Sequence, residues 1–362
     1  MTVEAQEVPV YFWNTISLKE KAVFYEHLSN LLDGGVTLIE ALQSFVAKTT
    51  NPLFYREIAQ LLLLIDSGDV MSIGMKKLPR TFDISEISIV EAGEQSGTMQ
   101  KSFGSLAEDL RNRQELGQKL KGAMAYPAII LTFLIAAILV VMIFVIPKLL
   151  PLFETADTEL PLSTRSLIAT SNFVSNHFVL IILFISFVGF LGYGYLQTPG
   201  GKRNFDMFVL KIPLIGTVYK NYLIVRISTT LGLLLGAGIP ILKTLRLCGT
   251  STGNALYEEV FAAIVKHVEQ GHKIAESFSA IDTKNEYFTQ DFLQLLAAGE
   301  KTSTINKVCG KISIQYTREV DNSVATMVKF VEPMAILVSG VFVVWFAFAI
   351  FSAVLKITET VS

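Results

Sequence analysis

The sequence predicts an all-α membrane protein in which two tandem-repeat cytoplasmic helical bundles are combined with three transmembrane helices. Three observations lead to this fold class: a pattern that occurs twice, three long uncharged apolar stretches, and no convincing alternation of the kind that marks strands. Of the 362 residues, 51% are hydrophobic and only 17% are charged. A soluble domain usually has about 25% charged residues, so the composition favours a membrane protein.

The duplication is visible as segments that return at a constant spacing. Residues 31–36 return as residues 234–239, which is 203 positions later. Residues 92–94 return as residues 298–300, 206 positions later. A spacing held over about 100 residues identifies a repeated structural unit. Each unit is predicted to be a soluble helical part followed by a membrane anchor.

The soluble part of each unit has the signals of several short helices. Ser17 and Glu20 have the spacing of a capping box, in which each side chain satisfies a free backbone N–H group of the other residue. Thr37 and Glu40 repeat this arrangement at the start of the next helix. The last helix of each unit is expected to continue into the membrane. There Pro127 and Pro333, 206 positions apart, would kink or break it.

Three uncharged stretches, at residues 122–147, 178–201 and 333–355, are long enough to cross a membrane as helices. A helix needs about 20 apolar residues for this purpose. The predicted organisation is an N-terminal lead (1–16), a first bundle (17–122), a first transmembrane helix (123–147), a short periplasmic segment (148–177), a second transmembrane helix (178–198), a second bundle (199–328), a third transmembrane helix (329–355) and a periplasmic tail (356–362).

Basic residues orient these spans. Lysines and arginines number four in residues 111–121, five in 202–226 and three in 311–329, against two in 148–165 and one after the third span. Because basic residues accumulate on the cytoplasmic side, both bundles are expected there. The first residues lack the basic and apolar regions of a secretory signal peptide, so the N-terminus is also expected in the cytosol.

The sequence contains no recognisable catalytic, cofactor-binding or metal-binding motif. It has no phosphate-binding loop with a terminal Gly-Lys-Ser or Gly-Lys-Thr. His267 and His272 are five positions apart, which places them on different sides of a helix, so a shared metal is not expected. Cys248 and Cys309 are the only cysteines and fall in predicted cytosolic segments, where a disulfide is not expected.

The second predicted span has a face of small residues. Ser186, Gly189 and Gly192 are candidates for close packing against another membrane helix. The segment 189–194 partly matches a dinucleotide-binding fingerprint, but it lies in an apolar span with no preceding strand, so we reject that interpretation. The spans carry almost no ionisable groups, with Glu332 at the edge of the third. This argues against an ion-coupled transporter.

Residues 91–99, Glu-Ala-Gly-Glu-Gln-Ser-Gly-Thr-Met, resemble the Glu-x-Gly-Glu-x-Ser-Gly-x-Leu signature of the type II secretion F family. The members of this family are polytopic inner-membrane platform proteins of type II secretion systems and type IV pili. The resemblance covers residues 17–355. In the second copy the leading glutamate and the final glycine are absent from residues 297–303. Further family-like segments follow in order at residues 126–128, 145–148, 159–165, 210–216 and 231–240.

The resemblance implies a function and a set of partners. The platform would couple a cytoplasmic hexameric ATPase to the extraction of pilin or pseudopilin subunits from the bacterial inner membrane and to filament assembly. It would have no catalytic activity or cofactor. Other inner-membrane alignment proteins and further copies of the chain are expected as partners, and nucleic acid is not. The sequence leaves open whether the machine is a pilus, a secretion system or a conjugative thin pilus, and which repeat contacts the ATPase.

The candidate partner-binding residues come from the signature in both copies and from the edge of the third span. An alternative for the signature is a helix–turn–helix corner, with Gly97 as a cap and Glu94 solvated or capping a neighbour. For Glu332 the alternative is a carboxylate at the membrane interface. Alternative functions are a small membrane transporter or channel with cytoplasmic regulatory domains, and a membrane-anchored enzyme. The candidates are Glu91, Gly93, Glu94, Ser96, Gly97, Gly299, Glu300 and Glu332.

Overall fold

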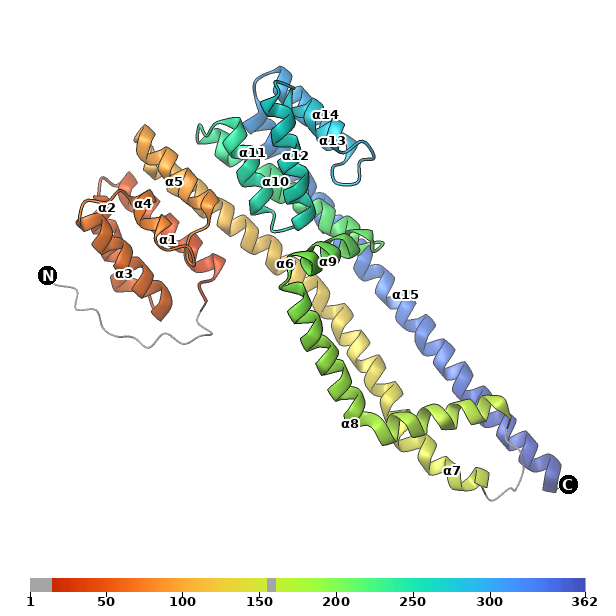
Figure 1. Ribbon diagram of the computed structural model, residues 1–362. Coiled ribbons are helices and arrows are strands. Elements are labelled where there is room, and N and C mark those ends of the chain that lie inside the picture. The colour runs from red at the N-terminus through yellow and green to blue at the C-terminus, as the bar shows by residue number, and fades with distance from the viewer. Residues whose placement is uncertain (1–14, 155–160, 362) are drawn as a thin grey trace. The chain divides into compact units, whose positions relative to one another are not determined.

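The computed structural model describes residues 15–154 and 161–361, and this part of the chain contains helices and no strands (Figure 1). Most of the predicted N-terminal lead lies outside the described residues. The fold class predicted from the sequence, all-α with a tandem repeat and three candidate membrane helices, is confirmed. The chain forms two compact units, the first made of Met1–Lys119 and Asp206–Asp321 and the second of Leu120–Phe205 and Asn322–Ser362.

The first soluble repeat is a bundle of short helices that begin at the predicted signals. The Ser17 hydroxyl accepts the Glu20 N–H at 3.2 Å, and the Glu20 carboxylate accepts the Ser17 N–H at 2.7 Å. Thr37 and Glu40 form the second predicted capping box. The helices are α1 (Leu18–Asp33), α2 (Leu38–Lys48), α3 (Pro52–Asp66), α4 (Met71–Lys76), α5 (Ile84–Ser96) and the start of α6 (Met99–Val140).

The second repeat has the same series of helices and many of the same local devices. Asn51 and Asn254 cap equivalent helices, each accepting two backbone N–H groups. Gly35 and Gly238, with φ of 79° and 82°, end the first helix of each repeat. The helices are α9 (Pro199–Lys211), which leads in, then α10 (Ile215–Gly236), α11 (Ile241–Ser251), α12 (Ala255–Glu269), α13 (Ile274–Ile281), α14 (Gln290–Lys301) and the start of α15 (Ile305–Val361).

Each repeat has its own aromatic core. In the first, the Phe24 ring packs against Phe45 at 5.0 Å between centroids and against Phe54 at 5.6 Å. In the second, Phe288 packs against Phe278 and Phe292. Full burial of one such side chain stabilises the fold by about 2–3 kcal/mol. The aromatic cores therefore hold each repeat together as a bundle.

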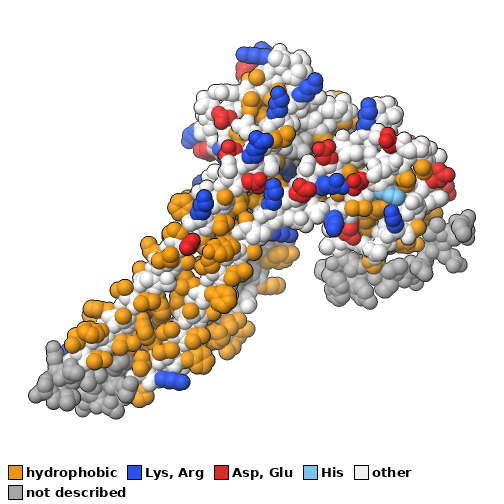
Figure 2. Space-filling view, turned by 180° about the vertical axis from the view of Figure 1, so that it is seen from behind, with side chains coloured by type: hydrophobic (Ala, Val, Ile, Leu, Met, Phe, Trp, Pro, Cys, Tyr) orange, Lys and Arg blue, Asp and Glu red, His pale blue; other side chains and the backbone are white. Residues whose placement is uncertain are grey.

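Three helical stretches are long and apolar enough to cross a membrane: Met99–Leu149, Leu162–Leu196 and Ile305–Lys356. Their most apolar parts have mean hydropathies of 3.4, 2.3 and 2.6 and are almost entirely exposed to the surroundings of the chain. Figure 2 shows their surface covered with hydrophobic side chains. Helices α6 and α15 continue unbroken through Pro127 and Pro333, so neither proline interrupts its helix.

The segment between the first two apolar stretches is largely helical. A π-helical turn, Val141–Val145, follows α6 and leads into α7 (Ile146–Glu154), and α8 (Leu162–Leu196) bends at His177, which has non-helical backbone angles. The early part of α8 packs with the π-helical turn, α7 and α15 around a small core: Met142, Ile146, Leu167 and Ala349.

Two buried hydroxyls attach this early part of α8 to its neighbours. Ser171 donates to the Met142 carbonyl at 2.5 Å, and Thr164 donates to the Ala349 carbonyl at 2.6 Å. Met142 lies in the π-helical turn, and Ser175 of α8 also donates to its carbonyl, at 3.5 Å.

Candidate functional site: a duplicated corner and a buried charge cluster

The signature residues of the first repeat form a tight corner between α5 and α6. Gly97 ends α5 with a left-handed φ of 68°, and Thr98 donates its N–H to the Gly93 carbonyl at 2.8 Å. A Cβ atom on Gly93 would lie 2.4 Å from Ser102 Oγ. Ser96 donates its hydroxyl to the Ala92 carbonyl at 2.7 Å. The two glycines are therefore needed for the turn and for the close approach of α5 and α6.

The second repeat forms the same corner although its final glycine is missing. Ser303 takes the left-handed conformation with φ of 54°, and Thr304 donates its N–H to the Gly299 carbonyl at 2.8 Å. A Cβ atom on Gly299 would lie 3.0 Å from Val308 Cβ. The corner is thus kept by backbone bonding, at the cost of a left-handed residue that has a side chain.

The glutamate of each corner caps the short helix that precedes it. Glu94 accepts the Ser72 N–H at 3.2 and 3.3 Å with its two oxygens. Glu300 accepts the Ile274 and Ala275 N–H groups at 2.7 and 3.0 Å. Neither α4 nor α13 has a side-chain cap of its own, so these carboxylates satisfy free donors at the positive end of each helix.

Glu91 differs from the rest of the signature because it connects the two repeats. Its carboxylate pairs with Lys76 at 3.2 Å and with Lys243 of α11 at 3.3 Å. Burial raises the pKa of Glu91, but the hydrogen bonds from these two lysines outweigh burial and hold the pKa below its ordinary value. The equivalent residue in the second repeat is Ala297, which leaves an open hollow of about 240 Å³.

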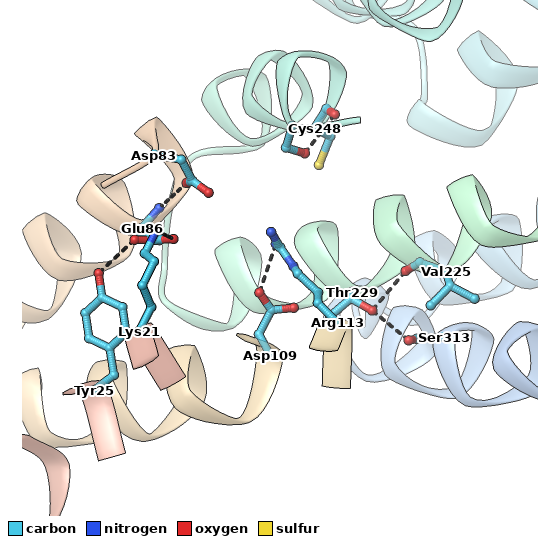
Figure 3. Close-up of polar contacts among 11 residues, drawn as sticks. Lys21, Tyr25, Asp83, Glu86, Asp109, Arg113, Val225, Thr229, Cys248 and Ser313 are labelled. Carbon is cyan, nitrogen blue, oxygen red and sulfur yellow. Dashed lines mark hydrogen bonds and ion pairs between the residues drawn. The ribbon is translucent and has the colours of Figure 1, made fainter. Parts of the chain in front are cut away.

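A buried charge cluster, which was not predicted from the sequence, lies in the first repeat. Lys21 Nζ is 2.5 Å from Glu86 Oε1, and the Tyr25 hydroxyl donates to Glu86 Oε2 at 2.9 Å. Figure 3 shows Lys21 and Tyr25 pointing to the same carboxylate. Burial raises the pKa of Glu86 to about 7, and Asp83 adds to this, while Lys21 and Tyr25 act in the opposite direction. In sequence, the available signal was that Lys21 has helical spacing to the apolar Tyr25 and Leu28 of α1.

A second ion pair, between the buried Asp109 and the half-buried Arg113, lies nearby on α6. Asp109 and Arg113 are 2.8 Å apart, and burial raises the pKa of Asp109 against the influence of Arg113. Asp109 Oδ1 has no hydrogen-bond partner among the described residues. Both residues line a cavity of about 350 Å³ bordered by α6, α10 and α15. This polar cavity lies at the contact between the repeats.

The second repeat lacks the buried Lys–Glu pair. At the positions equivalent to Lys21 and Glu86 it has Ile224 and Phe292, both fully buried. The two repeats therefore share a backbone plan but differ in the chemistry of their interiors at these two positions.

The remaining candidates lie in the second unit. Glu332 is exposed and makes no hydrogen bond or ion pair with any described residue. Cβ atoms on Gly189 and Gly192 would meet nothing within 4 Å, and Ser186 is exposed, so this face has no partner within the described part of the chain. Partner binding by Glu332 and helix packing by the small residues stay predictions.

The histidine expectation was wrong in its geometry. The rings of His267 and His272 are stacked, with centroids 3.9 Å apart, because α12 ends at Glu269 and Gly271, with φ of 93°, turns the chain back. Among the described residues, no group of three or more His, Cys, Asp or Glu side chains is placed to hold a metal ion.

A duplicated helical bundle, a capped corner in each copy and three apolar helices together define a polytopic membrane protein with an internal repeat. The chain belongs to the type II secretion system protein F family, whose model matches residues 24–147 and 227–353. These two matched segments correspond to the two repeats, each with its following apolar helix.

Similar proteins come from two kinds of machine. The chain is 29% identical to a type IV pilus assembly protein PilC of Thermus thermophilus, over 95% of this chain and 84% of that protein. It is 28% identical to the type IV pilus assembly protein TapC of Aeromonas hydrophila, over 94% and 82%. It is 24% identical to a type II secretion system protein F of Aeromonas hydrophila, over 98% and 90%.

Proposed function

We propose that this chain is the inner-membrane platform of a type IV pilus or type II secretion machine. In this proposal it couples a cytoplasmic hexameric ATPase to the extraction of pilin or pseudopilin subunits and to filament assembly. It acts as an interaction protein and not as an enzyme. The observation that carries the proposal is that, in a member of this family, each soluble repeat continues without a break into an apolar helix long enough to span a membrane.

Two features of the chain support a mechanical role. A continuous helix transmits a displacement along its axis without the loss that a flexible linker would introduce, and α6 and α15 provide two such connections. The apolar stretches carry no charge between Lys121 and Lys148 or between Glu332 and Lys356, which suits lateral contact with apolar pilin helices better than ion conduction.

The proposed topology places the N-terminus and both repeats in the cytoplasm. The distribution of basic residues supports this orientation. Gly97 and Ser303 keep the same corner, whereas Glu91 is replaced by Ala297 and its hollow, so an ATPase that distinguishes the repeats would do so there. Gly93, Glu94, Gly97, Gly299 and Glu300 make internal contacts, and any partner binding by them would follow from the shape of the corner.

The proposal is tested by deletion of the gene and complementation. Deletion is expected to abolish surface pili or secretion while the cellular level of pilin or pseudopilin stays unchanged, and the wild-type chain should restore the fibres. Two substitutions of Glu332 extend the test. Glu332→Lys is expected to reduce fibre assembly. If Glu332 is only a carboxylate at the membrane interface, Glu332→Gln should reduce fibre assembly less than Glu332→Lys does. Normal fibres in the deletion strain would exclude the proposed function.

A further inference from the structure

The contact between the two soluble repeats is one-sided. Helix α5 of the first repeat packs against α10 and α11 of the second, and Glu91 on α5 pairs with Lys243 on α11. The equivalent elements are α14 of the second repeat and α1 and α2 of the first, and these make no comparable contact among the described helices. Each repeat therefore uses one of two equivalent faces inside the chain and leaves the other open.

Burial of equivalent residues confirms that the face on α14 is open. On α5, Ser85 and Ile89 border α10 and are only 6% and 3% exposed. Their equivalents on α14 are Asp291, which is exposed, and Leu295, which is half-buried. The fifth helix of the second repeat thus has the same position as α5 but lacks the neighbour that covers α5.

The complementary face on the first repeat is also uncovered. On α10, Thr230 and Leu234 are buried where they border α5. Their equivalents on α1, His27 and Leu31, are half-buried. The chain therefore has two open faces. The α1–α2 face of the first repeat is equivalent to the α10–α11 face, and the α14 face of the second repeat is equivalent to the α5 face.

We propose that a second copy of this chain docks its α1–α2 face on the α14 face of the first copy. The contact repeats between chains the packing that α10–α11 and α5 make within one chain. Such a head-to-tail contact leaves one face of each kind open on every pair, so further copies add in the same way until a ring closes. The occupant is argued from the chain itself, because the chain already contains a working example of the two faces in contact.

The charges on the two open faces are also complementary, with signs opposite to those of the contact within the chain. On the α14 side, Lys273 and Lys301 are exposed at the rim of the hollow beside Ala297, and neither has an ion-pair partner among the described residues. On the α2 side, Glu40 stands where α11 has Lys243. The internal contact joins an acid on the fifth helix to a base on the second helix. The proposed contact joins bases beside the fifth helix to an acid on the second helix.

The Glu40 carboxylate is available for this role. Its Oε2 accepts the Thr37 N–H at 3.1 Å and the Thr37 hydroxyl at 2.8 Å, and its Oε1 accepts no hydrogen bond from any described residue. The hydrogen bonds from Thr37 hold the pKa of Glu40 below its ordinary value, so the group is ionised at neutral pH. The exposed Asp291 and Gln294 keep the α14 face polar, as expected for an interface between chains that also exist separately.

Site-specific cross-linking between two tagged copies tests the contact. Full-length chains with Glu40→Cys and with Lys301→Cys, each with its own tag, are co-expressed, and isolated membranes are treated with a bismaleimide. We expect a mixed-tag dimer that is absent when either variant is expressed alone. The matched control replaces Lys301→Cys with Lys284→Cys, an exposed lysine elsewhere in the second repeat, and should give no dimer. Glu91→Cys with Lys243→Cys in one chain is the positive control.

Charge reversal provides the second arm. In this arm the cross-linking sites are Ala298→Cys in one chain and Gln43→Cys in its partner. Charge reversal by Lys273→Glu with Lys301→Glu in the first chain is expected to lower the mixed-dimer yield several-fold. Glu40→Lys in the partner is expected to restore the yield. Three results would overturn the proposal. The first is the absence of a mixed dimer, and the second is a dimer formed by Glu40→Cys chains alone, which indicates a two-fold contact. The third is cross-linking to a different protein such as the assembly ATPase. Fibre assembly is not measured, so the outcome is independent of the proposed function.

Discussion

Lys21 and Glu86 form a buried ion pair in the first repeat, at the positions that Ile224 and Phe292 occupy in the core of the second. At these equivalent core positions, one repeat is therefore packed with charged side chains and the other with apolar side chains. The ion pair is the more sensitive of the two, because each charge depends on the other after removal from water.

Loss of one partner of this pair is expected to destabilise the first repeat. At pH 8, where Glu86 is ionised in the wild type, Lys21→Met leaves this residue buried without a cation and should lower the free energy of unfolding by about 3 kcal/mol. The matched control is Ile224→Met at the equivalent position, a volume-conserving swap that should cost less than about 1.5 kcal/mol. Thermal unfolding of the purified protein in detergent measures both. Equal effects of the two substitutions would mean that the ion pair has no special role.

The stability of the protein should depend on pH through Glu86. Burial raises the pKa of Glu86 from the ordinary 4.5 to about 7, so between these values the folded chain holds a proton that the unfolded chain releases. The stabilising contribution is therefore complete below pH 4.5 and is lost as the pH rises through 7, with a slope of up to about 1.4 kcal/mol per pH unit.

The check compares the wild type with Glu86→Gln between pH 5 and 8. The wild type should lose stability relative to the variant as the pH rises from 5 to 7, and the difference should then level off. Two parallel curves would show that Glu86 titrates at its ordinary pKa in the folded chain.

The close approach at the first corner makes Gly93 intolerant of a side chain. Gly93→Ala places a methyl group 2.4 Å from Ser102 Oγ and is expected to cost about 2 kcal/mol through overpacking. Gly117→Ala in α6 is the control, because its Cβ would meet nothing within 4 Å, and it should stabilise the helix by up to about 1 kcal/mol. If both changes stabilise the protein, α5 and α6 do not approach as closely as described here.

The second corner should improve when its missing glycine is supplied. Ser303 has a left-handed φ of 54°, so Ser303→Gly is expected to stabilise the protein by about 1 kcal/mol, measured as a shift in the unfolding midpoint. The reverse change in the first corner, Gly97→Ser, should destabilise by a similar amount. A destabilising Ser303→Gly would indicate that the serine side chain makes a contact that outweighs its backbone strain.

The sequence predicted the parts of the fold that are encoded locally or by repetition. The capping boxes at Ser17 and Thr37 follow from residue type and spacing, and the uncharged stretches follow from composition. The buried pair of Lys21 and Glu86 was not predicted, because the two residues are 65 positions apart and meet only in the tertiary structure.

The histidines and the candidate site show the same limit. The stacking of His267 and His272 depends on the turn at Gly271, which helical spacing does not include. The signature was recognised from its residues, but its capping bonds to α4 and α13 required the structure. Glu91 was predicted as a candidate because it belongs to the signature. Its pairing with Lys243 of the other repeat has no sequence signal.

The native cysteines are unsuitable reporters of topology, although both were expected to be shielded by the cytoplasmic membrane. Cys248 and Cys309 are fully buried, so they would resist labelling on either side of a membrane. Introduced cysteines at exposed positions avoid this ambiguity. Lys48 in the first repeat, Lys284 in the second and Leu162 between the first two spans are exposed.

The most direct test of a platform with both repeats in the cytoplasm is therefore labelling of these three single-cysteine variants with a membrane-impermeant maleimide. In intact cells, Leu162→Cys should be labelled, while Lys48→Cys and Lys284→Cys should be labelled only after the cells are permeabilised. Labelling of Lys284→Cys but not Lys48→Cys in intact cells would place the two repeats on opposite sides of the membrane and exclude a platform with both repeats in the cytoplasm.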